Sequence, residues 1–127
     1  MNKLKVVAII LILIVAVIAA GQYYLAVSTR SMVNAVATTQ TAYHRSGDSP
    51  DTRKKMRLFF SLWQKNSRIL PMMIDHREID IVNTSVARLP AYLENSESPE
   101  FDAECDILKM QLAHLWAVEK INWENIL

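Results

Sequence analysis

The N-terminal segment constrains the fold of this chain more than any other feature, because residues 6–20 contain no polar side chain. After Lys5 the apolar run continues to Val27 with one amide side chain, Gln22, so the expected membrane-spanning segment is residues 4–27. A helix rises about 1.5 Å per residue and the hydrocarbon core of a bilayer is about 30 Å thick, so about 20 residues cross it. The run therefore predicts a transmembrane helix, with Tyr23 and Tyr24 at its outer boundary.

The charges that flank this helix predict its orientation. Lys3 and Lys5 precede the apolar run, whereas only Arg30 and Arg45 follow it within about 20 residues. Positively charged flanks stay in the cytoplasm. We therefore expect a single-pass protein of the cell membrane, with residues 1–5 as a cytoplasmic tail and the C-terminal domain extracytoplasmic.

A cleaved secretory signal is the alternative interpretation of the same segment. Such signals also combine a basic start, an apolar centre and small residues at the end, and Ala19 would suit a cut after Gly21. The apolar core exceeds the usual length of a signal, and apolar residues resume at Tyr23. The retained anchor is the favoured interpretation.

The rest of the chain is predicted to be helical nearly throughout. The sequence holds only two glycines, and no stretch alternates apolar and polar residues in the way an exposed strand does. Turn formers cluster at residues 46–50 and 95–99, and each cluster leads into a serine, a proline and an acid, which are typical of a helix N-terminus. A third helix is expected to start near Pro71, and Pro90 is expected to bend it or end it early.

Apolar residues recur at helical spacing in each expected helix, which predicts one buried face per helix. The expected core positions are Met56, Phe59, Phe60, Leu62, Trp63, Leu70, Ile79, Val82, Val86, Leu89, Leu93, Phe101, Cys105, Leu108, Leu112 and Leu115. A weaker apolar stripe, formed by Met32, Val36 and Tyr43, lies in the polar segment between the membrane and Gly47. Short connections favour antiparallel neighbours. The predicted fold class is all-α: the transmembrane helix, a helical stalk over residues 28–48, and an antiparallel bundle of three to four helices over residues 49–127.

The balance of charge, with 14 basic and 13 acidic residues, argues against a nucleic-acid partner. Basic residues concentrate over residues 45–68 and acidic residues over residues 94–106, so we expect pairing between these regions within the bundle or between protomers. The alternative for Arg53 to Arg57 is an anionic surface or lipid sensor. Cys105 is the one cysteine, so no intrachain disulfide forms, and its core position predicts a buried thiol rather than an intermolecular disulfide.

Residues 75–80, with the sequence Asp-His-Arg-Glu-Ile-Asp, are the most chemically suggestive segment. On a helix, His76 and Asp80 are four residues apart and share a face. A metal-binding or acid–base enzyme centred on His76, Glu78 and Asp80 is one interpretation. First-turn dipole contacts and salt bridges are the simpler one.

The simpler interpretation is favoured because the enzyme needs more than this segment supplies. A metal requires three or four ligands, so His114 or Glu104 would have to complete the site. The sequence has no nucleophile-base-acid set, glycine-rich phosphate loop or paired-cysteine motif. We therefore expect no enzymatic activity, no cofactor and no metal.

The last six residues are apolar for the end of a chain. Free ends usually fray, so Trp123, Ile126 and Leu127 are expected to dock on the bundle. An exposed recognition tail is the alternative.

Three short motifs carry a resemblance to a known family: residues 76–80, 85–89 and 122–127, with Trp63 and Lys65 upstream. Over nearly its whole length the chain resembles a domain-of-unknown-function family of short single-pass membrane proteins of Gram-positive bacteria with a C-terminal helical domain. The resemblance implies a membrane-anchored helical domain and brings no activity, cofactor or binding site. The matching motif residues, of unknown role, are Trp63, Asp75, His76, Glu78, Asp80, Arg88 and Asn125.

These observations together predict a non-enzymatic, membrane-anchored helical interaction or accessory module of the cell envelope. Its expected partners are the lipid bilayer, through residues 4–27, and either another membrane protein or a second copy of the chain.

Overall fold

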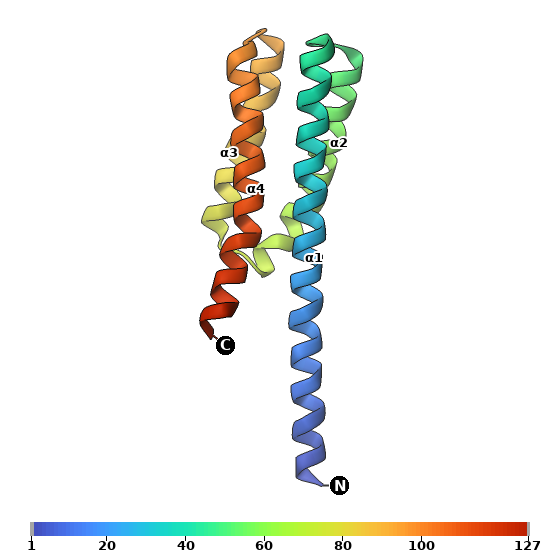
Figure 1. The fold of residues 1–127 in the computed structure, drawn as a ribbon, viewed down its shortest axis with the longest axis vertical. Coiled ribbons are helices and arrows are strands. Elements are labelled where there is room, and N and C mark those ends of the chain that lie inside the picture. The colour runs from blue at the N-terminus through green and yellow to red at the C-terminus, as the bar shows by residue number, and fades with distance from the viewer. Residues whose placement is uncertain (1, 127) are drawn as a thin grey trace.

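The computed structural model describes the backbone of residues 2–126 and the side chains of residues 2–117. All regular structure within this range is helical, which confirms the all-α part of the predicted fold class. The elements are α1 (Lys3–Ser46), α2 (Pro50–Ile69), the short 3-10 helix η1 (Leu70–Met72), α3 (His76–Glu94) and α4 (Ser98–Ile126) (Figure 1).

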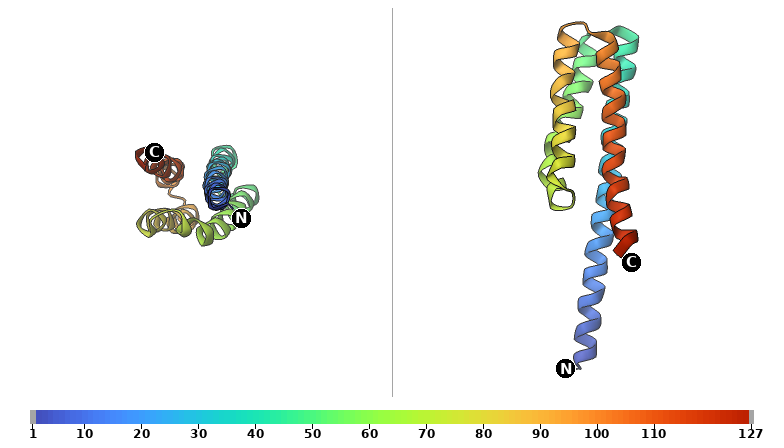
Figure 2. Two further views of the ribbon diagram at one scale, coloured as in Figure 1. Left: turned by 90° about the horizontal axis from the view of Figure 1, so that it is seen from below. Right: turned by 90° about the vertical axis from the view of Figure 1, so that its left-hand side faces the viewer.

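The four α-helices form an up-and-down bundle from which the N-terminal half of α1 protrudes (Figures 1 and 2). Helix α1 packs against α2 and α4, and α3 packs against α4. The α1–α2 and α3–α4 connections lie together at one end of the bundle, and the α2–α3 connection lies at the end from which α1 emerges (Figure 1). The expected antiparallel helical bundle is therefore present, with four helices.

Helix α1 combines two different surfaces along its 44 residues. It is the one helix, among the described residues, that is long and apolar enough to cross a membrane, and none of its most apolar window is buried in the protein. The first fully buried residue of α1 is Leu25. A single helix of about 66 Å thus joins an uncovered apolar half to a half that belongs to the bundle core.

Residues 28–48 differ from the stalk predicted for them, because most of this segment is the first helix of the bundle. The expected apolar residues of this segment are buried in the core, namely Met32, Val36 and Tyr43. Threonines are buried with them, and their hydroxyl groups donate hydrogen bonds to backbone carbonyls of the same helix. Thr29 Oγ1 donates to the Leu25 carbonyl at 2.7 Å, and Thr39 Oγ1 donates to the Ala35 carbonyl at 2.9 Å. A segment that appears too polar for a core can therefore join one.

Helices α2 and α4 start at the two predicted serine–proline patterns. Ser49 caps α2, accepting a hydrogen bond from the Thr52 backbone N–H at 3.2 Å, and Pro50 occupies the first turn. Helix α4 begins at Ser98, also as predicted. Gly47 ends α1 with a positive φ of 61° that favours glycine.

Helix α3 starts later than expected and does not end at Pro90. Pro71 lies inside η1, and α3 begins only at His76, where Asp75 caps it by accepting from the Arg77 N–H at 2.9 Å. Pro90 neither ends α3 early nor stops its last turn, since the helix continues to Glu94. The buried residues Leu89 and Leu93 flank this proline, so core packing offsets the hydrogen bond that proline removes.

The core confirms the predicted faces most closely on α4. All five of its seam residues are fully buried, namely Phe101, Cys105, Leu108, Leu112 and Leu115. Tyr43 of α1 packs on Phe101 with ring centroids 4.3 Å apart. Phe60, Leu62 and Val86 are half-buried at the edge of the core rather than inside it.

Candidate functional site

At the start of α3, the side chains of Asp75 and Arg77 contact each other. Besides the cap on the Arg77 N–H, the carboxylate of Asp75 accepts a hydrogen bond from Arg77 Nη2 at 3.1 Å. These bonds from Arg77 hold the pKa of the Asp75 carboxyl below its usual value. Both side chains are exposed, so the pair shapes the helix start rather than a cavity.

The remaining charged residues of this segment point in different directions. Glu78 Oε2 lies 4.0 Å from His114 Nε2 of α4, at a hollow of about 380 Å³ that Gln111 also lines. His76 and Asp80 are exposed and do not line that hollow. Residues two apart on a helix lie on nearly opposite sides, so Glu78 is turned away from both of them.

This separation removes the convergence on which the metal or acid–base alternative depends. Glu78 meets His114, but His76 and Asp80 do not join them, and no hydrogen bond or ion pair links His76 to Asp80 in the described part of the chain. Within the same residues, no group of three or more His, Cys, Asp and Glu side chains is placed to hold a metal ion.

Two other motif residues tie helices together. Trp63 of α2 is buried, and its Nε1 donates to Asn83 Oδ1 of α3 at 2.7 Å. Arg88 of α3 approaches the buried Glu104 of α4, with 3.7 Å between Arg88 Nη1 and Glu104 Oε1. Trp63 thus contacts α3, and Arg88 contacts α4.

The C-terminal predictions fall beyond the side chains that the structure describes. Asn125, and the expected docking of Trp123, Ile126 and Leu127, lie outside the described residues.

The basic region pairs locally. Arg53 donates to both carboxylate oxygens of Asp48 at 2.7 and 2.8 Å, and Lys55 Nζ lies 2.9 Å from Asp51 Oδ2. These residues lie at the end of the bundle remote from the protruding half of α1, where α2 begins (Figure 1). The expected pairing with residues 94–106 is not formed as an ion pair anywhere in the described residues.

The acidic region finds its partners on α1 and on α4 itself. Gln40 Nε2 donates to Asp102 Oδ1 at 2.7 Å and to Asp106 Oδ1 at 3.0 Å. His44 Nε2 also contacts the Asp102 carboxylate, and Lys109 lies 3.2 Å from Asp106. Hydrogen bonds from Gln40 and Lys109 hold the pKa of the Asp106 carboxyl below its usual value. This network fastens α4 to α1.

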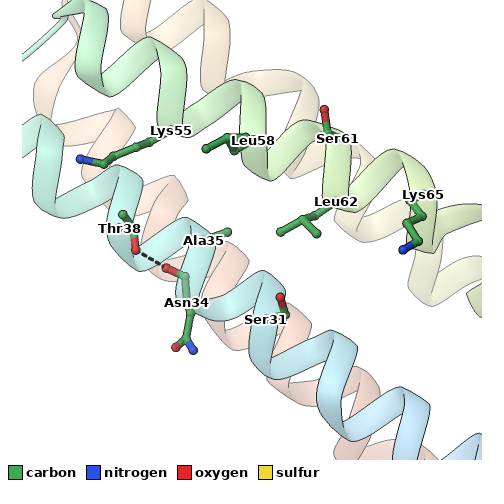
Figure 3. Close-up of a pocket in the computed structure, with 9 residues that line it drawn as sticks. All are labelled: Ser31, Asn34, Ala35, Thr38, Lys55, Leu58, Ser61, Leu62 and Lys65. Carbon is green, nitrogen blue, oxygen red and sulfur yellow. Dashed lines mark hydrogen bonds between the residues drawn. The ribbon is translucent and has the colours of Figure 1, made fainter.

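An apolar groove of about 520 Å³ runs between α1 and α2. Ala35, Leu58 and Leu62 project toward the space between the two helices, and Leu58 is 57% exposed (Figure 3). Lys55 and Lys65 lie toward its two ends (Figure 3). The remaining lining residues are Ser31, Asn34, Thr38 and Ser61.

The sequence pattern did not reveal this groove. Leu58 lies outside the apolar stripe expected for α2, beside the charged Arg57. The available signal is its spacing of four residues from Leu62, which places both on one side of the helix. The α1 wall is built from small and polar residues that carry no apolar periodicity.

Comparison with known proteins gives one match. The profile of a protein family described as "Domain of unknown function (DUF4363)" matches residues 19–126, which cover the bundle and the last residues before it. No curated protein and no solved structure matches the chain. The resemblance to a domain-of-unknown-function family is thereby confirmed.

Proposed function

The chain belongs to the DUF4363 family, and on that premise we propose that it is a membrane-anchored, non-enzymatic accessory module of the cell envelope. In this proposal, residues 4–27 cross the membrane and the groove between α1 and α2 receives a helix of a membrane protein partner.

The observation that carries the proposal is the contrast along α1. None of its most apolar stretch is buried in the protein, whereas its other half is part of the bundle core. Uncovered apolar helix surface of this length requires an apolar environment, and a bilayer supplies one of the right thickness. Since the helix is continuous, anchoring it would hold the bundle directly beside the bilayer.

The flanking lysines support the orientation. Lys3 and Lys5 begin the helix, and positively charged flanks favour the cytoplasm. The bundle is then extracytoplasmic. The match to the family profile begins at residue 19, so it covers the bundle and leaves most of the apolar run outside it.

The groove supports a helical partner of a particular chemistry. Two adjacent helices leave a channel that a third helix fills with its apolar side chains. Lys65 has no ion pair among the described residues, whereas Lys55 is already paired with Asp51. We therefore expect an amphipathic helix whose apolar stripe faces Leu58 and Leu62 and whose flank carries an acidic residue near Lys65.

Photocrosslinking of the full chain in native membranes tests the groove. A photoreactive amino acid at Leu58 is expected to capture a membrane protein, and the same residue at Met110, an exposed position on α4, is the matched control. A Lys65→Glu change should lower the yield, whereas Lys54→Glu, outside the groove, should not.

The outcomes separate the possible occupants. An adduct with the mass of two copies would make the partner a second copy of the chain. Equal adducts from positions 58 and 110, or none at either, would contradict the groove as the interaction site.

The anionic-surface alternative is weakened by distance. Residues 53–57 lie about 20 to 30 Å further along α1 than Tyr24, because Lys55 lines hollows beside residues 34–41 of that helix. Electrostatic attraction in physiological salt is screened over about 8 Å. The same bilayer would therefore exert little pull on this patch, and the local pairing of Arg53 and Lys55 neutralises part of its charge.

A further inference from the structure

The three connections between the α-helices differ sharply in polarity. Residues 47–49 and 95–97, at the end of the bundle remote from the protruding half of α1, read Gly-Asp-Ser and Asn-Ser-Glu. Residues 69–74, around the α2–α3 connection, read Ile-Leu-Pro-Met-Met-Ile. Connections exposed to water are ordinarily polar, so six consecutive non-polar residues at this position need a physical reason.

Core packing accounts for only part of this apolar connection. Leu70 and Ile74 are buried, and the Leu70 carbonyl accepts hydrogen bonds from the Met73 and Ile74 N–H groups at 2.9 and 2.8 Å. These contacts fix the connection to the bundle. Met72, at its tip, is 84% exposed, the highest exposure among the large apolar side chains of the described residues.

The connection lies level with the apolar run of α1. Met73 lies against α1 at Gly21, where its Sδ would be 3.5 Å from an added Cβ. The helix below this level, residues 4–20, is about 25 Å long at about 1.5 Å per residue. A hydrocarbon core of about 30 Å is thicker than this, so a bilayer that covers the apolar run reaches the α2–α3 connection.

We propose that the α2–α3 connection is a second membrane contact, in which Met72 enters the boundary between acyl chains and lipid headgroups. This inference rests on the membrane anchoring proposed above. Arg68, in the last turn of α2, is exposed and forms no ion pair among the described residues, so its guanidinium is free to bind a lipid phosphate. The bilayer interface is continuous with the exposed surface of α1, and this continuity identifies it as the occupant.

Spin labelling of the full chain measures the depth of Met72 directly. Single cysteines at Met72, Val15 and Met110 are introduced in a Cys105→Ala background and labelled. The protein is then reconstituted into vesicles of phosphatidylcholine with phosphatidylglycerol. Power saturation compares collision of each label with oxygen, which concentrates in the acyl region, and with a water-soluble nickel chelate. Val15 reports the anchor, and Met110 is an exposed methionine on the side of the bundle.

The expected oxygen-to-nickel ratio is severalfold higher for M72C than for M110C and approaches that of V15C. A ratio for M72C equal to that of M110C, with V15C still in lipid, would overturn the second contact and leave the anchor intact. A nickel-accessible V15C would overturn the anchor and this inference together.

Discussion

The ion pair between Arg88 and Glu104 offers a quantitative test of how α3 is held to α4. The side chain of Glu104 is 5% exposed, and that of Arg88 is 54% exposed. Glu104 Oε1 has no hydrogen-bond partner among the described residues, and Arg88 Nη1 at 3.7 Å is the cation facing it. An Arg88→Met change keeps an apolar stem and leaves the carboxylate buried without its counter-charge.

The geometry sets the size of the effect. Two unit charges about 4 Å apart attract by about 4 kcal/mol at an effective dielectric constant of about 20. Water reaches the half-exposed arginine and would solvate the carboxylate partly once the arginine is gone. The net loss should therefore lie between the values for exposed and buried pairs, at about 1 to 3 kcal/mol. For a bundle of this size the melting temperature should fall by about 5 to 15 °C.

Thermal unfolding of the full chain in detergent, followed by circular dichroism at 222 nm, measures this loss. Glu104→Gln removes the buried charge, so Arg88→Met should cost much less in that background. An equal cost in both backgrounds would refute the electrostatic explanation and assign the effect to packing of the Arg88 stem.

Further predictions concern single positions. Replacing Gly47, whose φ is 61°, by alanine should lower the free energy of unfolding by about 1 to 3 kcal/mol because of backbone strain. The added Cβ would meet no atom within 4 Å, so a steric clash is not the cause. An unchanged melting temperature would contradict the strain. Burial raises the pKa of the Cys105 thiol to about 12, so a disulfide reagent at pH 8 should label it only after denaturation, and rapid labelling of the folded chain would show that it is accessible. A side-chain hydrogen bond from Arg53 holds the pKa of the Asp48 carboxyl below its usual value, so this stabilisation is present above pH 4 and is lost as the pH falls through the folded-state pKa. Arg53→Gln should reduce that acid-induced loss, and an identical acid profile would argue against the pair.

The fold could be predicted where each local signal agreed with the packing. The serine-proline-acid patterns located the starts of α2 and α4, and the regular spacing of apolar residues in α4 identified its buried residues. The role of residues 28–46 was missed because buried hydroxyls such as that of Thr39 bond to their own helix, which sequence polarity does not show. The path of α3 through Pro90 depends on tertiary packing that local rules do not contain.

The candidate sites were harder to predict because they depend on how neighbouring helices are rotated. Spacing correctly placed His76 and Asp80 four residues apart on a helix, but burial of Ile79 and Val82 turns that helix so that Glu78 is the residue that meets α4. The groove between α1 and α2 arises from the small residues of one helix beside the leucines of the other. No single segment carries that information.

The most direct test of the membrane anchor is alkaline phosphatase fused after residue 127, with its activity measured in carbonate-washed membranes and in the soluble fraction. A retained single-pass helix with the bundle outside the cytoplasm predicts active phosphatase that stays in the washed membranes at the full length of the fusion. Active phosphatase released as a shorter soluble product would show that the apolar segment is a cleaved signal. An inactive fusion retained in the membrane, with activity restored when a cytoplasm-only reporter replaces the phosphatase, would contradict the orientation.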